Sequence, residues 1–259
     1  MFGTVIVGIG IAGRVRIRDL LNPLPSSASE KMSIKGFVSR RTLDNEQGVK
    51  QITLEEALNR EDIQAAIICT ENVTHEEYIR KFLDAGKHVC VEYPMSLSVA
   101  VARELWDLAD KKGGPFQPGF GFASFGGIAR LTWLVDLFGE LTLTAAEMEE
   151  QEESKYMKLT ARFLTKEKRP LTWIEERAPG LGRVKNINFR FDSGTLDHIP
   201  SAPKEPVGIF MQDLNWFGEK LLGQVLSEQL QAERRRILHC LELADKIKEL
   251  CQKPAQNNL

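Results

Sequence analysis

The stretch VIVGIGIAGRVRIRDL, residues 5–20, decides the fold. A short apolar strand runs into Gly8, Gly10 and Gly13, and a helical pattern follows at once. A G-x-G-x-x-G turn between a strand and a helix is typical of the first βαβ unit of a dinucleotide-binding domain. Gly8 permits the tight turn, Gly10 lets the backbone approach a pyrophosphate, and Gly13 brings the helix against the strand. The candidate cofactor-binding residues of this turn are Gly8, Gly10, Ile11, Ala12 and Gly13.

The first 114 residues support this interpretation over a plain glycine turn, because they alternate strands and helices. The first helix presents Ile17, Leu20 and Leu21 on one face. Thr53 and Thr74 each begin a helix with a predicted capping box, since a glutamate follows three residues later. The predicted strands are 4–7, 33–39, 65–70 and 87–94, and a longer helix covers 97–112. Such alternation needs crossover connections, so we predict a parallel sheet with helices on both faces.

The pattern changes in the second half of the chain. Residues 113–127 concentrate glycine and proline, which marks a boundary or an irregular loop. A helix and several strand-like segments with short connections follow, which favours a mostly antiparallel sheet. Two helices close the chain, the second with Ser227 as its predicted N-cap. The predicted fold class is therefore α/β: an N-terminal Rossmann dinucleotide-binding domain, residues 1–114, is followed by an α+β domain, residues 115–259, with a largely antiparallel sheet and C-terminal helices.

Composition argues against several classes of protein. The chain has 259 residues and a formal net charge of −2, so it lacks the overall basic field with which proteins bind nucleic acid. No apolar run approaches the roughly 18 residues of a membrane span, and no basic stretch precedes the apolar N-terminus. The four cysteines lie in strand-like or helical contexts rather than in a secreted-type framework. We therefore expect a cytoplasmic protein with reduced thiols, no nucleic-acid partner and no membrane.

The end of the second predicted strand indicates which dinucleotide binds. NAD-specific sites place an acidic residue there to hold the ribose 2′-hydroxyl, whereas this chain has Ser39, Arg40 and Arg41. Guanidinium groups suit a 2′-phosphate because they offer it a charged planar fork. The sequence therefore predicts NADPH as the preferred cofactor, with NADH bound less tightly; the alternative is an exposed basic turn without a ligand.

Seven segments carry a resemblance to a known family. They are VIVGIGIAGRVRIRDL, IKGFVSRR, GKHVCVEYPMSLS, GIARLTWLVDLFGEL, YMKLT, WIEERAPGL and RRRILHCLELA. They resemble the biliverdin reductases, which belong to the glucose-fructose oxidoreductase type of dehydrogenase, and they extend through both predicted domains. The resemblance implies reduction of the open-chain tetrapyrrole biliverdin to bilirubin, in haem catabolism, by hydride from NADPH or NADH. We expect a monomer.

The resemblance also implies which residues carry the chemistry. Sugar-oxidising relatives carry Glu-Lys-Pro after a strand of the first domain and, on a later helix, an Asp followed four residues on by a His. Here the first motif is Glu92-Tyr93-Pro94. Arg130 stands at the helix position of that Asp, and Leu134 at the position of that His. Hydride addition to a conjugated bilin bridge needs no alcohol base, but it needs positive charge and a proton for a pyrrole nitrogen. We predict Arg130 and Tyr93 as catalytic residues, against the alternatives of a surface arginine and of a ring packed on Pro94.

Further cofactor neighbours follow from the resemblance. The loop within TENVTHEEY borders the cofactor in this family, so Glu71, Asn72 and His75 are predicted neighbours of NADP. Glu92 is predicted to join them. A helix-capping role is the alternative for His75.

The resemblance also implies a set of candidate zinc ligands, which are His239, Cys240 and Cys251. A continuous helix would separate the two cysteines by about 16 Å, at about 1.5 Å per residue. Zinc–sulfur bonds are only about 2.3 Å long. We therefore favour two packed thiols and a helical histidine over a zinc site.

The resemblance breaks within residues 113–127. The family continues, after the helix that ends here at Lys112, with another strand, a helix and the first strand of the second sheet. This chain passes from Gly114 through PFQP directly to the loop before Arg130, with no apolar strand between. We therefore expect the parallel sheet to end one strand early. The alternative function is a non-catalytic NADP-binding sensor or scaffold, derived from this family and inactive because of the missing segment.

Overall fold

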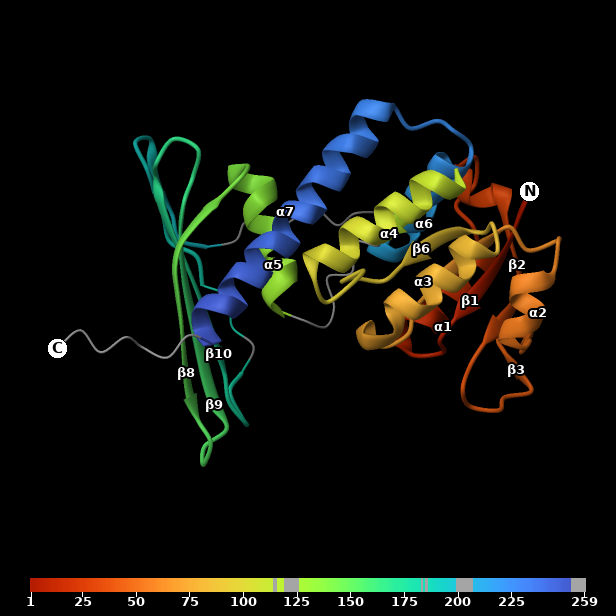
Figure 1. Cartoon of the computed structure of the whole chain (residues 1–259), viewed down its shortest axis with the longest axis horizontal. Helices are drawn as coiled ribbons and strands as arrows, with labels where there is room; N and C mark the ends of the chain where they lie inside the picture. Colours follow the sequence, from red (N-terminus) through yellow and green to blue (C-terminus); the bar gives the residue numbers. More distant parts are fainter. Residues whose placement is uncertain (114–115, 119–125, 183, 185, 199–206, 253–259) are drawn as a thin grey trace.

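The computed structural model describes residues 1–113, 116–118, 126–182, 184, 186–198 and 207–252. A parallel sheet with its helices lies at one end of the molecule, and an antiparallel sheet lies at the other (Figure 1). A long helix, α7 (Ser227–Gln252), runs between the two. Most of the glycine- and proline-rich stretch, where an irregular loop was predicted, lies outside the described residues.

The parallel sheet has the strand order β2-β1-β5-β6-β7. Its strands are β1 (Phe2–Val7), β2 (Met32–Val38), β5 (Ala65–Ile68), β6 (His88–Val91) and β7 (Phe116–Pro118), and each neighbouring pair is parallel. The predicted parallel sheet is thus confirmed. The expectation that it ends one strand early is wrong, because β7 pairs with β6 from Val89↔Phe116 onward. β7 gave no apolar signal since it is only three residues long, and Pro118 is tolerated because β7 is an edge strand.

The helices of this part begin close to the predicted positions. They are α1 (Ile11–Leu21), α2 (Leu54–Asn59), α3 (His75–Asp84) and α4 (Val99–Lys112), with the 3₁₀ turns η1 (Ala28–Lys31) and η2 (Asn72–Thr74) and a small hairpin, β3 (Asn45–Glu46) and β4 (Val49–Lys50). The capping box of Thr53 is confirmed. That of Thr74 is wrong: its hydroxyl donates to the Glu71 carbonyl at 2.7 Å, because η2 precedes the helix.

The buried face of α1 is shifted from the one predicted. Ile17 and Leu20 are buried, but Leu21 is 45% exposed. The buried stripe of α1 also includes Gly13 and Arg16, which moves its centre away from Leu21. The helix therefore buries a charged residue that the apolar pattern did not mark.

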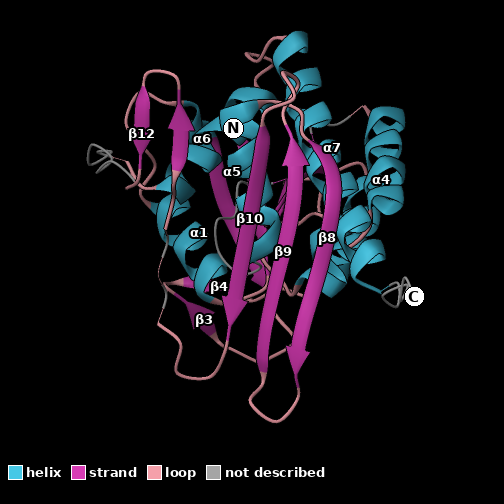
Figure 2. Ribbon diagram, turned by 90° about the vertical axis from the view of Figure 1, so that its left-hand side faces the viewer, coloured by secondary structure: helices cyan, strands magenta, loops and turns pink. Residues whose placement is uncertain are grey.

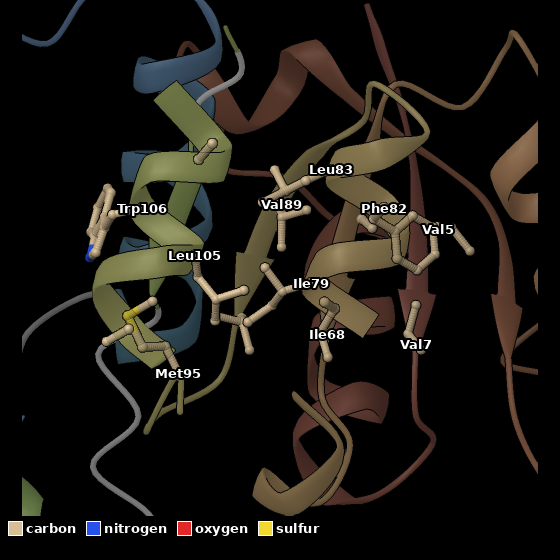
Figure 3. Packing of buried hydrophobic residues seen from close by; sticks show 14 of the residues in the cluster. Val5, Val7, Ile68, Ile79, Phe82, Leu83, Val89, Met95, Leu105 and Trp106 are labelled. Atoms are coloured by element: carbon tan, nitrogen blue, oxygen red, sulfur yellow. The ribbon is translucent and has the colours of Figure 1, made fainter. Parts of the chain in front are cut away.

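Both faces of the parallel sheet are covered. On one face, Ile68 and Val89 pack against Phe82 of α3 and Leu105 of α4, and Leu241 of α7 joins this cluster (Figure 3). On the other face, the cluster of Ile6, Ile67 and Cys90 includes Leu214 and Phe217 of α6 (Ile209–Leu221). A Cβ on Gly218 of α6 would lie 2.8 Å from the Ala28 carbonyl oxygen, so only glycine lets α6 approach η1 this closely. The chain thus returns to complete the N-terminal core, and the division at residues 114 and 115 stays a prediction.

The second sheet is antiparallel, as predicted, in the order β10-β9-β8. Its strands are β8 (Thr142–Gln151), β9 (Tyr156–Leu164) and β10 (Pro170–Arg177), and a separate hairpin is formed by β11 (Phe189–Phe191) and β12 (Gly194–Leu196). Phe163 and Trp173 pack against Leu134 of α5 (Gly126–Phe138) and Leu243 of α7. The other face of the sheet is open toward the viewer in Figure 2. Ser227, the predicted N-cap, is the first residue of α7 itself.

Within the described ranges, none of the helices combines the length and the apolar character that crossing a membrane requires.

Candidate active site

The glycine turn has the geometry of a phosphate-binding loop. Gly8 has φ +97°, and a Cβ there would lie 2.8 Å from the Cys69 carbonyl oxygen. A Cβ on Gly13 would lie 2.0 Å from the Gly8 carbonyl oxygen, so Gly13 sets how closely α1 approaches β1. Around Gly10 a Cβ would meet no described atom within 4 Å, which leaves room for a ligand. The environments of Gly8 and Gly13 fit the tight turn and the close helix packing predicted for them, and the approach of Gly10 to a pyrophosphate stays a prediction.

The N-terminus of α1 faces the same space. No side chain caps it, so the first-turn N–H groups stay available to a phosphate, and no acidic residue lies in that turn. Ile11, the first helical residue, is 86% exposed, and Ala12 follows it half-buried. The turn therefore fits the pyrophosphate of a dinucleotide.

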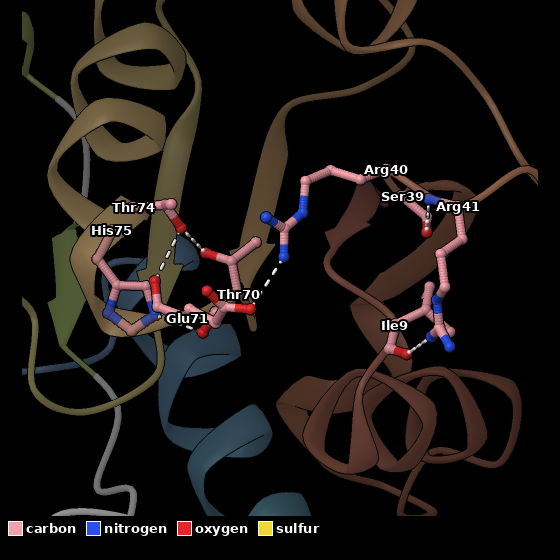
Figure 4. Close-up of polar contacts among 8 residues, drawn as sticks. All are labelled: Ile9, Ser39, Arg40, Arg41, Thr70, Glu71, Thr74 and His75. Atoms are coloured by element: carbon pink, nitrogen blue, oxygen red, sulfur yellow. Dashed lines mark hydrogen bonds and ion pairs between the residues drawn. The ribbon is translucent and has the colours of Figure 1, made fainter.

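The basic turn after β2 lies beside the glycine turn (Figure 4). Arg41 donates from Nη2 to the Ile9 carbonyl oxygen at 2.6 Å, and its N–H donates to Ser39 Oγ at 3.1 Å. Arg40 donates to Glu71 Oε1 at 2.9 Å, and both side chains are largely exposed, 76% and 67%. A cavity of about 580 Å³ lies next to this turn and is lined in part by Ser39 and Arg40. Arg40 thus borders a hollow at the end of β2, where a 2′-phosphate is expected, whereas the Arg41 guanidinium lies on the glycine turn.

The loop after β5 brings its predicted residues to different depths. Glu71 lies at the surface and pairs with Arg40, and Asn72 begins η2. His75 is only 1% exposed, with Nδ1 at 2.8 Å from the Pro94 carbonyl oxygen and Nε2 at 3.0 Å from the Thr70 carbonyl oxygen. Glu71 is therefore the member of this group that lies beside the basic turn, whereas His75 lies beneath the loop.

The Glu92-Tyr93 segment follows β6. Glu92 Oε1 accepts hydrogen bonds from Arg16 Nε at 3.0 Å and Nη2 at 2.8 Å. The Tyr93 hydroxyl lies 3.2 Å from Oγ1 of Thr132 on α5. Burial raises the pKa of Tyr93 far above its ordinary value, and the hydrogen bond to Thr132 lowers it only in part. Tyr93 is thus a neutral phenol that lies where the first sheet meets α5.

Arg130 lies on α5, about half a turn before Thr132, and is half-buried. Among the residues that the structure describes, Arg130 makes no hydrogen bond or ion pair. Leu134, which takes the place of the histidine of the sugar-oxidising relatives, is buried in the core. The helix that carries the predicted cation is therefore tied to the Tyr93 loop through Thr132.

The predicted metal residues do not come together. α7 is continuous through Cys240 and Cys251, which separates them by about 16 Å at about 1.5 Å per residue. His239 Nε2 accepts a hydrogen bond from the Leu141 N–H at 3.0 Å. Burial raises the pKa of Cys240 to about 11, so this residue is a packed thiol. The zinc interpretation is not supported by this geometry.

Among the described residues, the most deeply buried charge near this site is Arg16, which no sequence pattern indicated. It lies on α1 with 1% of its surface exposed and binds Glu92, the Phe210 carbonyl oxygen at 2.8 Å and the carboxylate of Asp213 on α6. Burial alone would lower the pKa of Arg16, but the charges of Asp213 and Glu92 outweigh it and raise that pKa. Its partners lie 76 and 197 residues away in the chain, so no local pattern could have paired them.

Comparison with known families agrees with the two-part architecture. Residues 2–120 match the family described as "Oxidoreductase family, NAD-binding Rossmann fold", and residues 108–203 match "Biliverdin reductase, catalytic". The glycine turn, the basic turn and these matches define the chain as an oxidoreductase of the dinucleotide-binding class.

Curated relatives narrow the class. The chain is 47% identical to human biliverdin reductase A, over 96% of this chain and 96% of the relative, and 46% identical to the mouse protein, over 97% of each. The chain therefore belongs to the biliverdin reductase family. The alignment with the human protein spans 287 positions, more than the 259 residues of this chain, so the relative carries residues that this chain lacks.

Solved structures share the fold. A biliverdin reductase from Synechocystis in complex with biliverdin and NADP+ matches with a TM-score of 0.77 at 18% identity, covering 97% of this chain and 99% of its own. A 3-ketoreductase from Actinomadura kijaniata in complex with TDP-benzene and NADP matches with a TM-score of 0.72 at 14% identity, covering 96% and 98%. At these identities the likeness concerns the fold alone.

Proposed function

We propose that this protein reduces biliverdin to bilirubin with NADPH. The observation that carries the proposal is the 47% identity to human biliverdin reductase A, which extends over 96% of both chains. The protein acts as a cytoplasmic monomer, and NADH serves it less well than NADPH.

The cofactor preference rests on the basic turn. Arg40 and Arg41 supply two positive charges at the end of β2, and Ser39 stands where NAD-specific sites have an acid. Gly8, Gly10 and the uncapped N-terminus of α1 receive the pyrophosphate.

The chemistry divides between the cofactor and the chain. The nicotinamide, when bound, supplies the hydride for a carbon bridge of the bilin, and a proton added at a pyrrole nitrogen completes the two-electron reduction. Arg130 stabilises the negative charge that develops on the bilin and orients the water that delivers the proton. Tyr93 contributes as a neutral phenol, because its raised pKa keeps the proton on the hydroxyl. It positions the bilin rather than acting as a base.

A colour assay tests the function. Purified protein, biliverdin and NADPH should turn from green to yellow, whereas a non-catalytic sensor would bind NADPH and leave the mixture green.

Arg130→Ala should lower kcat about a hundredfold or more while the dissociation constant of NADPH stays nearly unchanged, because charge stabilisation acts in the transition state. Arg162→Ala is the matched control, since Arg162 is an exposed arginine on β9 that pairs with Glu147. A wild-type rate in Arg130→Ala would remove Arg130 from the mechanism.

A further inference from the structure

Arg16 is the centre of a buried group of charges whose signs do not balance. This group, the Arg16 cluster, consists of Arg16 on α1, Glu92 after β6 and Asp213 on α6, with side chains that are 2%, 12% and 4% exposed. A single guanidinium thus serves two carboxylates, and both accept charge-assisted hydrogen bonds from it. The cluster therefore carries one excess negative charge.

The groups around the cluster do not cancel this charge. Arg16 also donates to the Phe210 carbonyl oxygen at 2.8 Å and lies over the Phe210 ring at 4.9 Å, and neither group is ionised. Burial raises the pKa values of the neighbouring thiols Cys69 and Cys90, so both stay neutral. Among the described residues, the charges that act on the pKa of Cys69 all belong to the cluster.

The order of the strands indicates which half of a dinucleotide lies near the cluster. In the order β2-β1-β5-β6, the basic turn follows β2, the glycine turn follows β1, and Glu92 directly follows β6. A dinucleotide lies across the carboxyl ends of such strands, with its pyrophosphate at the glycine turn. Its adenosine half at β2 leaves the nicotinamide half over β5 and β6. Neighbouring strands are about 4.8 Å apart, so Glu92 lies about 10 Å from the glycine turn, on the nicotinamide side.

Hydride transfer changes the charge of this half of the cofactor. When NADPH gives a hydride to a carbon of the bilin, the NADP+ that remains carries one more positive charge, on its nicotinamide ring. We propose that the excess negative charge of the Arg16 cluster favours the oxidised nicotinamide over the reduced one, and that Asp213 supplies this charge. The proposal rests on the proposed function, because it takes NADPH as the hydride donor.

Asp213 is the member that gives the cluster its sign. Arg16 and Glu92 alone would form a neutral pair, whereas Asp213 makes the cluster anionic. Asp213 is buried, so salt screens its charge only weakly. At an effective dielectric constant of about 20, a unit charge about 10 Å away changes a binding constant on the order of tenfold. Arg130 and the cluster thus act on the two charges that hydride transfer creates, one on the bilin and one on the nicotinamide.

The dissociation constants of NADP+ and NADPH test the proposal without any substrate. NADPH binding is followed by its fluorescence, and NADP+ binding by competition with NADPH. Asp213→Asn keeps the shape of the side chain and leaves Arg16 paired with Glu92. The ratio of the dissociation constant of NADP+ to that of NADPH should rise about three- to tenfold, because only the oxidised ring carries the added charge.

A purely structural role of Asp213 gives a different result, because it would weaken both cofactors equally. An unchanged ratio in Asp213→Asn would therefore overturn the proposal. Glu92→Gln is a second variant, for the case that Asp213→Asn does not fold, since its amide oxygen still accepts from Arg16 while the same unit of charge is lost. The ratio should rise in this variant too, and an unchanged ratio would equally overturn the proposal.

Glu233→Gln is the matched control. Glu233 is a buried carboxylate that also pairs with a residue of α6, Lys220, and the two side chains are 7% and 2% exposed. This end of α6 packs against η1, which precedes β2, so the pair lies toward the amino ends of the strands and away from the cofactor. The ratio should stay within about twofold of the wild-type value even where Tm falls. A rise equal to that of Asp213→Asn would show that the ratio follows damage to α6, which would refute the charge effect.

Biliverdin turnover separates this proposal from the proposed function. Absence of turnover, together with the expected change in the ratio, would refute the proposed function alone. Normal turnover with a ratio that Asp213→Asn leaves unchanged would refute the charge effect alone.

Discussion

Replacing Arg16 with methionine tests the buried ion pairs that join α1 to the end of β6 and to α6. Methionine keeps the length of the side chain but removes the cation that Glu92 and Asp213 share. Their side chains are 12% and 4% exposed, so water cannot replace the lost partner. Removing one member of a buried ion pair costs about 3–5 kcal/mol. For a chain of this size, such a loss lowers Tm by roughly 6–20 °C.

The free energy of unfolding can be measured by urea titration, with the four tryptophans as the fluorescent probe. Arg80→Met is the matched control, because Arg80 also binds two carboxylates, Glu76 and Glu104, but lies 35% exposed. Exposed pairs contribute about 0–1 kcal/mol each, so the control should lose less than about 2 kcal/mol. Adding Asp213→Asn to Arg16→Met should recover part of the loss. Equal losses in the Arg16 and Arg80 variants would show that burial does not strengthen this network.

Three further outcomes concern the cofactor site. Gly13→Ala should weaken NADPH binding by at least tenfold and lower Tm, because the new Cβ would lie 2.0 Å from the Gly8 carbonyl oxygen and would push α1 away. Gly182→Ala, where a Cβ meets no described atom within 4 Å and φ is not positive, gives the comparison for Tm and for NADPH titration. Replacing Arg40 and Arg41 together with alanine should weaken NADPH far more than NADH, and equal losses would refute the 2′-phosphate assignment. Glu71→Gln should tighten NADPH binding about two- to fivefold at low salt. The reason is that the exposed ion pair between Glu71 and Arg40, worth under about 1 kcal/mol, no longer competes with the phosphate for Arg40. An unchanged dissociation constant would show that Glu71 does not compete.

Local signals predicted the glycine turn and most elements. Gly8 and Gly13 were predictable because the positive φ of Gly8 and the contact of Gly13 with the Gly8 carbonyl oxygen both arise within one strand-turn-helix unit. Leu21 was misplaced because the buried stripe of α1 contains Arg16, whose partner Asp213 lies on a helix near the end of the chain. Apolar periodicity cannot detect a stripe that is completed by an ion pair.

The residues of the candidate site were less predictable from the sequence than the helices and strands. Arg40 and Glu71 were both named as cofactor residues, but their mutual pairing depends on two loops that only the sheet brings together. His75 contacts the carbonyl oxygens of Thr70 and Pro94, and such contacts leave no mark in a sequence because every residue has a carbonyl oxygen. β7 escaped detection because it is only three residues long, and its backbone pairing with β6 leaves no mark in the sequence.

α7 contributes to two cores at once. Its residues Ile237 and Leu241 belong to the cluster at the parallel sheet, whereas Cys240 and Leu243 belong to the cluster beneath the antiparallel sheet. No hinge can operate between the two cores without bending this helix within a single turn. We therefore expect a large, flat substrate to enter through movement of surface loops rather than through domain closure. For the same reason, we expect the two cores to unfold in one cooperative transition and not as separate units.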